Sequence, residues 1–181
     1  MRIGGQHIGL RLSGRRFELR NRLARARYFR GHGVHSPFVY DIVREVFMRR
    51  ELLPGDRSLY RALCGAGVAP RRAVQLQNLA IHCGYATFGM NRAEGELCIA
   101  LPDLPRAATL ALVAGAAVAH RTVVLIAPYA GRERQALCRQ IIAAHRSTTV
   151  DNRGYLLVFN NQLPKQHFQL RTYTPKPETK V

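Results

Sequence analysis

This sequence lacks tryptophan and closely spaced pairs of cysteines. The chain has no tryptophan, and its four cysteines, Cys64, Cys83, Cys98 and Cys138, form no CxxC pair. Their gaps are too wide and irregular for a zinc ribbon or a secreted disulfide scaffold. We therefore expect reduced thiols, no metal site, and a cytoplasmic protein.

Long apolar runs and common catalytic motifs are absent as well. No uncharged apolar run approaches the roughly 20 residues that a membrane-spanning helix needs, so we expect no transmembrane segment. The sequence contains no GxSxG, SxxK, P-loop or GxGxxG motif, which argues against a serine nucleophile and a phosphate-binding loop. Its 181 residues, 47% of them hydrophobic, are nevertheless typical of one globular domain.

Lysine and acidic residues are scarce, whereas arginine is abundant. Of 28 basic residues only three are lysines, and 11 acidic residues leave a formal net charge of +17. Codon bias explains the arginine-to-lysine ratio but not the net excess. Guanidinium groups bind phosphates and carboxylates, so residues 15–30 are a candidate site for an anionic partner: RNA, an acidic protein or a membrane surface. The candidate anion-binding residues are Arg15, Arg16, Arg20, Arg22, Arg25 and Arg27.

Residues 1–70 have the pattern of a basic helical segment. A glycine-rich lead is followed by an amphipathic stretch over 15–30 and then by the turn Gly31-His32-Gly33-Val34-His35-Ser36-Pro37-Phe38, at residues 31–38. Ser36 and Pro37 predict the start of a helix that runs to Leu53. A third, short helix is expected up to Ala66.

Beyond residue 70 short apolar runs alternate with helical stretches, which predicts α/β architecture for a core over 71–173. The expected strands lie near 73–79, 96–101, 122–127, 148–151, 155–159 and 166–173, the last three forming an antiparallel finish. Helices are expected over 103–120 and 131–146. Residues 174–181 resemble a frayed tail, and the whole chain is expected to form one domain.

The connection Asp151-Asn152-Arg153-Gly154 has two interpretations. Asn and Gly favour the positive φ values of a tight turn between strands. The same four residues offer a carboxylate and turn amides to a ligand.

Two segments resemble a bacterial group of class I S-adenosylmethionine-dependent methyltransferases. The first is Arg30-Gly31-His32-Gly33-Val34-His35-Ser36-Pro37-Phe38-Val39-Tyr40-Asp41, similar to that group's N-terminal signature. The second, 151–171, resembles its last antiparallel strands, and 123–146 is similar in layout to the strand and helix before them. The resemblance implies a reduced Rossmann-like sheet with an antiparallel C-terminal hairpin, preceded by N-terminal helices.

The cofactor motif of that group is altered in this chain. Members carry a strand reading apolar-Glu-apolar-Gly-x-x-x-Gly, for which 74–81 is the best match. Gln75 replaces the acid, and Gln77 and Ile81 replace the two glycines. Ala127 and Pro128 stand where paired aspartates are expected. We therefore predict that the cofactor positions are vestigial, with no catalytic residue and no bound S-adenosylmethionine.

Three functional hypotheses follow. The first is a degenerate methyltransferase-like protein that acts by binding, a pseudoenzyme. The second is an active small-molecule methyltransferase with an altered cofactor pocket, which would bind S-adenosylmethionine. The third is an arginine-rich nucleic-acid-binding module. His32, His35 and Ser36 either stabilise the turn or line a substrate pocket.

Overall fold

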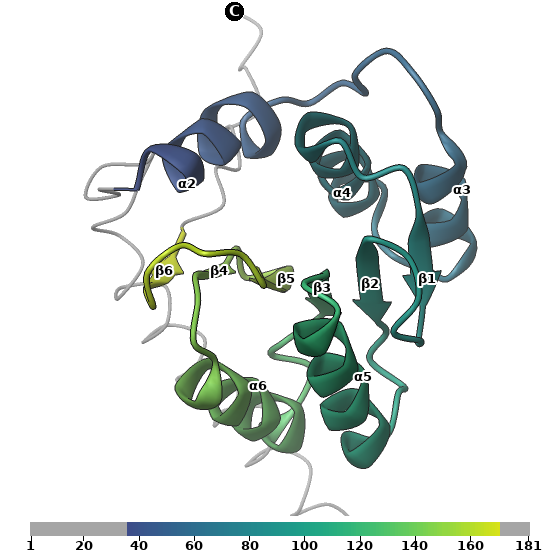
Figure 1. Cartoon of the computed structure of the whole chain (residues 1–181). Coiled ribbons are helices and arrows are strands. Elements are labelled where there is room, and N and C mark those ends of the chain that lie inside the picture. Colours follow the sequence, from purple (N-terminus) through teal and green to yellow (C-terminus); the bar gives the residue numbers. More distant parts are fainter. Residues whose placement is uncertain (1–35, 171–181) are drawn as a thin grey trace, which may run out of the picture.

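A mixed six-stranded sheet forms the centre of the computed structural model, which describes residues 36–170 (Figure 1). The strand order is β1-β2-β3-β5-β4-β6. β1, β2 and β3 are parallel, β5 runs antiparallel to both of its neighbours β3 and β4, and β6 is parallel to β4. The strands are β1 (Phe88–Met90), β2 (Leu97–Ala100), β3 (Thr122–Ile126), β4 (Thr149–Asp151), β5 (Tyr155–Val158) and β6 (His167–Gln169).

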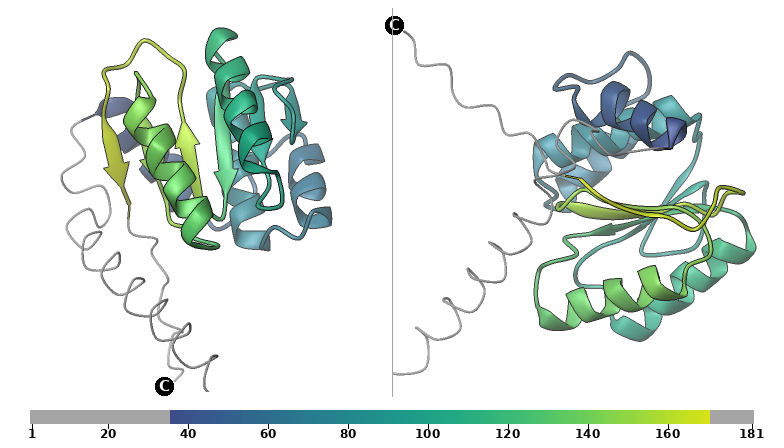
Figure 2. Two further views of the ribbon diagram at one scale, coloured as in Figure 1. Left: turned by 90° about the horizontal axis from the view of Figure 1, so that it is seen from below. Right: turned by 90° about the vertical axis from the view of Figure 1, so that its left-hand side faces the viewer.

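Helices cover both faces of this sheet, so the protein has three layers (Figure 2). α2, η2, α3 and α4 lie on one face, and α5 and α6 lie on the other. The helices are α2 (Pro37–Ile42), the π-helical η2 (Val43–Phe47), α3 (Ser58–Gly65), α4 (Pro70–Cys83), α5 (Arg106–Val118) and α6 (Arg132–Ala144). The prediction of α/β architecture is confirmed.

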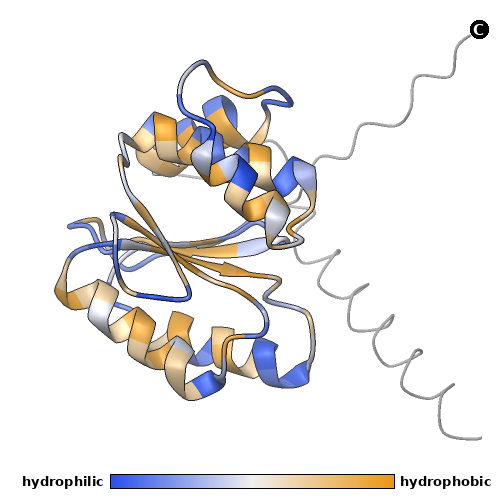
Figure 3. Cartoon of the chain, turned by 90° about the vertical axis from the view of Figure 1, so that its right-hand side faces the viewer, coloured by the Kyte–Doolittle hydropathy of each residue, from blue (hydrophilic) through white to orange (hydrophobic). Residues whose placement is uncertain are grey.

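Two hydrophobic clusters hold the layers together, one on each side of the sheet. The strands are largely hydrophobic (Figure 3), and every residue of β2, β3 and β5 is buried. Strands that are covered on both faces read as continuous apolar runs, which explains why the sequence located 96–101 and 122–127 correctly.

The first described helix begins where the sequence predicts. Ser36 is its N-cap, with Oγ accepting from the Val39 amide at 3.4 Å, and Pro37 occupies the first turn. The ring of Phe38 packs edge-on against Phe159 at 5.0 Å between centroids. The end of the N-terminal motif therefore contacts the end of β5. The helical stretch ends at Phe47, earlier than the predicted Leu53.

The strand predicted over 73–79 is wrong, because these residues belong to α4. Pro70 lies at the helix start, and Gly84 ends it in the left-handed region at φ 71°. The alternation of apolar residues with Gln75 and Gln77 suggested a strand. In the structure every residue of this run except Val74 is buried, because α4 packs against α3 and η2 as well as the sheet.

The sequence did not predict β1, which has three residues and a short link to β2. Parallel neighbours usually need a crossover of a dozen or more residues. The link over 91–96 suffices here because a three-residue strand is only about 10 Å long. Six residues are enough to lead the chain back along that distance to the start of β2. Gly95, at φ 78°, is pressed against the backbone of Phe88, 2.8 Å from where a Cβ would lie.

The hairpin of β4 and β5 is antiparallel, as expected, but β6 pairs with β4 in parallel. In the turn between β4 and β5 the positive φ falls on Arg153, at 66°, and not on Asn152 or Gly154. Asn152 is buried, with its amide donating to the Tyr155 hydroxyl at 2.7 Å. Gly154 serves a close approach, because a Cβ there would lie 2.2 Å from Nε of Arg72.

Candidate functional site

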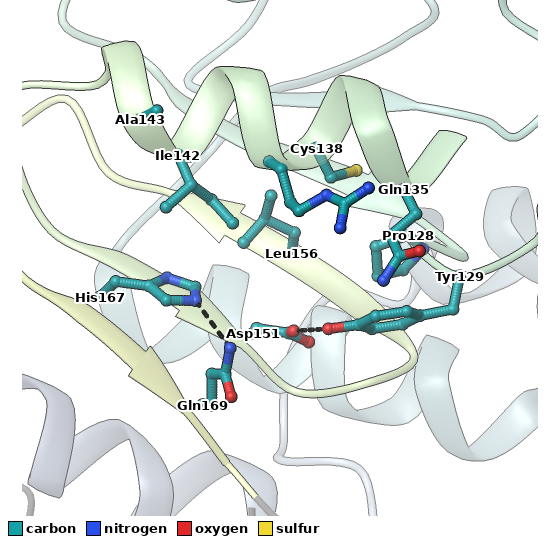
Figure 4. A pocket seen from close by; sticks show the side chains of 11 residues that line it. Pro128, Tyr129, Gln135, Cys138, Ile142, Ala143, Asp151, Leu156, His167 and Gln169 are labelled. Carbon is teal, nitrogen blue, oxygen red and sulfur yellow. Dashed lines mark hydrogen bonds between the residues drawn. The ribbon is translucent and has the colours of Figure 1, made fainter. Parts of the chain in front are cut away.

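A pocket of about 300 Å³ lies between α6 and strands β4, β5 and β6 (Figure 4). The loop after β3 closes one end of it, and β6 closes the other. Its lining combines apolar and hydrogen-bonding side chains from regions far apart in the sequence. The lining residues are Pro128, Tyr129, Gln135, Cys138, Arg139, Ile142, Ala143, Asp151, Leu156, His167 and Gln169.

Asp151 is the acid of this pocket. It ends β4, and only 3% of its surface is exposed. Its Oδ2 accepts from the Tyr129 hydroxyl, and its Oδ1 accepts from the Arg153 amide at 2.7 Å. The second bond belongs to the β4–β5 turn, so the backbone of that turn holds the carboxylate in place. The two interpretations of this turn, a tight connection and a candidate ligand site, therefore involve the same carboxylate.

His167 and Gln169 reach the opposite wall from β6, since alternate residues of a strand share one face. Nδ1 of His167 lies 2.8 Å from Oγ1 of Thr149, and its Nε2 lies 3.5 Å from Nε2 of Gln169. Each ring nitrogen of His167 thus lies within hydrogen-bond distance of a polar side chain, with Nδ1 near Thr149 and Nε2 near Gln169. This side of the pocket therefore presents an imidazole and an amide.

The wall beneath α6 is apolar. Leu156 and Ile142 line it together with Cys138, which is buried. Burial raises the pKa of the Cys138 thiol to about 11, so the group stays protonated at neutral pH. It therefore contributes a small apolar surface and not a nucleophile.

A second arrangement lies at the carboxyl ends of β2 and β3, where ligands bind in open α/β sheets. Arg134, on α6 and 9% exposed, sends Nη2 to the carbonyls of Ala100, Leu101 and Ile126 at 3.0, 3.1 and 3.2 Å. Its Nη1 donates to Oγ1 of Thr109 at 3.4 Å. The guanidinium thus joins the ends of two strands and α5.

All four hydrogen bonds of Arg134 end on neutral oxygens, and among residues 36–170 its buried Nε has no partner. Burial lowers the pKa of Arg134, but an arginine remains charged in a protein. The positively charged guanidinium of Arg134 therefore occupies the carboxyl ends of β2 and β3.

The structure separates the five predicted cofactor positions. Gln75, Gln77 and Ile81 lie on α4, and Ala127 and Pro128 follow β3. The first three therefore do not form the loop after a strand that the family motif requires. Only Pro128 lines the pocket of Figure 4.

The two glutamines on α4 have structural partners. Oε1 of Gln77 accepts from the Tyr60 amide at 2.9 Å, in the first turn of α3. Nε2 of Gln75 donates to the Phe47 carbonyl at 2.9 Å, and its Oε1 accepts from Arg72 at 3.0 Å. These amides connect helices to one another and to the β4–β5 turn. Both side chains are therefore buried structural connections, and neither lines the pocket of Figure 4.

The remaining sequence candidates divide in two. Ser36 caps α2, which is its structural interpretation. The other candidates lie outside the described residues: His32, His35, Arg15, Arg16, Arg20, Arg22, Arg25 and Arg27.

Cys83 and His82 do not form a nucleophile and its base. Burial raises the pKa of Cys83 to about 11, opposite to the shift that activates a thiol. Nε2 of His82 lies 2.8 Å from a carboxylate oxygen of Asp41, so the imidazole is engaged with α2. Cys64 is half-buried, and Cys98 is buried.

Sequence reasoning missed most of the pocket. The contact between Tyr129 and Asp151 joins positions 22 residues apart, and no local pattern predicts it. His167 and Gln169 face the pocket because they pair with Thr149 and Asp151 of β4, and the parallel pairing of β6 with β4 was not expected. The one usable signal was the acid at the start of the 151–154 turn.

Comparisons with protein-family models, curated proteins and solved structures find no match for this chain. Within residues 36–170 no helix is long and apolar enough to cross a membrane. The same part of the chain contains no group of three or more His, Cys, Asp or Glu residues placed to hold a metal ion.

Proposed function

We propose that this chain is a shortened, methyltransferase-like protein with a Rossmann-like sheet, and that it acts by binding a ligand and not by methyl transfer. The observation that carries this proposal is the position of Arg134. Its guanidinium contacts the last carbonyls of β2 and β3, at the edge where an α/β sheet normally receives its cofactor. A cofactor at this edge would have to displace a buried, multiply bonded side chain.

The order of the strands supports the methyltransferase-like part of the proposal. One reversed strand, β5, lies between β3 and β4, which run in the same direction as each other. The resemblance to the methyltransferase group implies such an antiparallel strand near the C-terminus. The contact of Phe38 with Phe159 also joins the two segments that carry the resemblance.

Two features support the loss of the reaction. The loop after β1 begins with Asn91, whose Oδ1 accepts from the Leu101 amide at 2.8 Å and so ties this loop to the end of β2. After β3, the Ala127 amide donates to the carbonyl of Gly154 at 2.9 Å. Hydrogen bonds within the protein therefore occupy both loops at the carboxyl edge.

The proposal is tested by titrating S-adenosylmethionine into the full chain in a calorimeter. We expect no saturable heat up to about 1 mM ligand, which corresponds to a binding free energy weaker than about −4 kcal/mol. A parallel assay follows transfer of a labelled methyl group to a metabolite extract, and we expect none.

An Arg134→Met variant serves as the matched comparison in both assays, because it removes the guanidinium and keeps an apolar side chain of similar length. Micromolar binding by the unmodified chain would refute the proposal, and labelled product would favour the alternative of an active small-molecule methyltransferase. Binding by the variant alone would identify Arg134 as the group that excludes the cofactor.

A further inference from the structure

We propose that the pocket between α6 and strands β4, β5 and β6 binds a nucleotide, either free or within a single-stranded nucleic acid, with the base inside and the phosphate at Arg139. This inference rests on the proposed function, because it names the ligand of a protein that acts by binding. The polarity of the pocket, its lining and the net charge of the chain each favour a nucleotide.

The polarity comes from two charged residues at different depths. Asp151 is buried and lines the pocket from β4, whereas Arg139 is exposed at its rim on α6. A phosphate or carboxylate inside would face the Asp151 carboxylate and be repelled. The pocket therefore favours a ligand whose hydrogen-bond donors point inward and whose negative charge stays outside. A nucleotide of guanine, adenine or cytosine has this polarity, since an exocyclic amino group lies at one end and the phosphate at the other.

The lining matches a planar ring with a polar edge. Tyr129 and His167 offer flat faces, and Gln135 and Gln169 offer amides that donate and accept hydrogen bonds. The volume of about 300 Å³ is at the small end of ligand-binding pockets, which span roughly 300–1,000 Å³. Proteins that read unpaired bases combine stacking surfaces with side chains that hydrogen-bond to base edges.

An amino-acid zwitterion shares the required polarity, with its ammonium group toward Asp151 and its carboxylate toward Arg139. An amino acid bound in this way would offer no hydrogen-bonding groups to the amides of Gln135 and Gln169, whereas the edge of a base would. The net charge of +17 also favours a partner with many phosphates over a neutral zwitterion. We therefore argue for the nucleotide, and the zwitterion becomes an outcome of the test.

The Asp151 carboxylate makes the identity of the base testable. Guanine presents two adjacent N–H donors on its Watson–Crick edge, whereas uracil presents one N–H flanked by two carbonyl oxygens. A carboxylate attracts the first edge and repels the carbonyls of the second. We expect a preference for guanine over uracil that depends on Asp151.

The experiment measures fluorescence anisotropy of labelled eight-nucleotide RNAs with the full chain. One RNA contains only uridine, and the other carries a single guanosine at its centre. We expect the guanosine RNA to bind about 10-fold more tightly, equal to about 1.4 kcal/mol. GMP and UMP titrated by calorimetry distinguish a free nucleotide from a base within a strand, and leucine, a neutral zwitterion, tests the amino-acid alternative.

Three variants locate the binding to the pocket. Asp151→Asn should remove the preference between the two RNAs. His167→Ala should weaken the binding of both RNAs. Because His167 is exposed, this second variant tests the pocket even if Asp151→Asn does not fold. Arg139→Ala should weaken binding at least threefold more than Arg61→Ala. Arg61 is the matched control, because it is an exposed arginine on α3, beyond the other face of the sheet.

Equal affinity for the two RNAs, equal losses for Arg139→Ala and Arg61→Ala, or tighter binding of leucine than of GMP would each overturn the inference. A titration of S-adenosylmethionine in the same preparation separates this result from the proposed function. Base preference together with micromolar S-adenosylmethionine binding would refute the proposed function and leave the nucleotide pocket. Absence of both would refute the pocket and leave the proposed function.

Discussion

Replacing Gln75 with leucine tests whether this amide is a structural connection or a side chain in an open cleft. Gln75 is 2% exposed on α4. Its Oε1 accepts from Arg72 at 3.0 Å, from the Tyr155 hydroxyl at 3.3 Å and from Asn152 at 3.4 Å. Its Nε2 donates to the Phe47 carbonyl at 2.9 Å. Leucine has a similar size and none of these groups.

The expected loss follows from the partners that remain. The Phe47 carbonyl and the Tyr155 hydroxyl proton lose the bonds that Gln75 provides, and each buried polar group left without a partner costs about 1–3 kcal/mol. The additional apolar surface of leucine returns about 1 kcal/mol. We therefore expect Gln75→Leu to lower the free energy of unfolding by about 3 kcal/mol, which corresponds to a fall in Tm of about 6–12 °C at this chain length.

Urea unfolding followed by circular dichroism measures this change. Gln77→Leu should cost about 1–2 kcal/mol, because it affects only the Tyr60 amide. Gln140→Leu on α6 should change stability by less than about 0.5 kcal/mol, because its partner, the Arg106 guanidinium, is exposed and can bond to water instead. A loss below about 0.5 kcal/mol for Gln75→Leu would refute the reasoning, because an amide that contacts solvent can be replaced at that cost.

Three further predictions use other parts of the chain. Burial raises the pKa of the Cys83 and Cys138 thiols from 9.0 to about 11, so iodoacetamide at pH 8 should modify them about 100-fold more slowly in the native chain than in urea. The same shifts mean that stability should fall as the pH rises from 9 through 11, where only the unfolded thiols ionise; a flat profile there would contradict the burial. Gly95→Ala should destabilise by about 3 kcal/mol, against about 1 kcal/mol for Gly67→Ala, because both have positive φ but only the first meets backbone at 2.8 Å; equal losses in urea would exclude the steric cause. Deletion of residues 1–30 removes a net eight positive charges, and the salt slope of RNA binding should fall by about 0.7 for each arginine that contacts a phosphate; an unchanged slope would exclude this segment as the RNA contact.

The parts of the fold that the sequence predicted are those fixed by local signals. The strands β2 and β3 are continuous apolar runs, and α5 and α6 follow Pro105 and Gly131. Each of these elements is recognisable from its own residues, because burial on both faces or a proline or glycine at the boundary is visible within one short window. Their boundaries differ from the prediction by three residues or fewer.

The prediction failed at α4 because burial there is set by other segments. An isolated helix has one apolar stripe, but α4 is buried around Gln75, Leu76 and Gln77 alike. The amides are tolerated inside because η2, α3 and the β4–β5 turn supply their hydrogen-bond partners. Pro70 and Gly84 were the local signals for a helix, and the apparent alternation outweighed them.

The candidate pocket could not be predicted for the same reason. Its acid, Asp151, was visible as part of a turn, but its partner Tyr129 comes from the loop after β3. His167 enters only because β6 crosses past β5 to pair with β4. Side chains that meet through sheet topology leave no spacing pattern in the sequence.

Arg134 is the residue at which stability and function can be separated. Its guanidinium is buried and, among residues 36–170, forms no direct ion pair, although Asp103 lies near enough to favour its charge; it bonds to the carbonyls of Ala100, Leu101 and Ile126 and to Thr109. Burying an unpaired charge costs several kcal/mol, and hydrogen bonds from a charged donor return about 1.5–3 kcal/mol each. With four such bonds the balance favours the arginine, so Arg134→Met should lower the free energy of unfolding by about 2 kcal/mol in urea. Arg134→Lys should cost more, because an ammonium retains the buried charge but lacks the planar fork that reaches several carbonyls.

If the methionine variant were as stable as the unmodified chain, the strand ends would not need this guanidinium. The buried charge would then be better explained by a ligand that binds at the carboxyl ends of the strands. That outcome would contradict the proposal that Arg134 closes this edge.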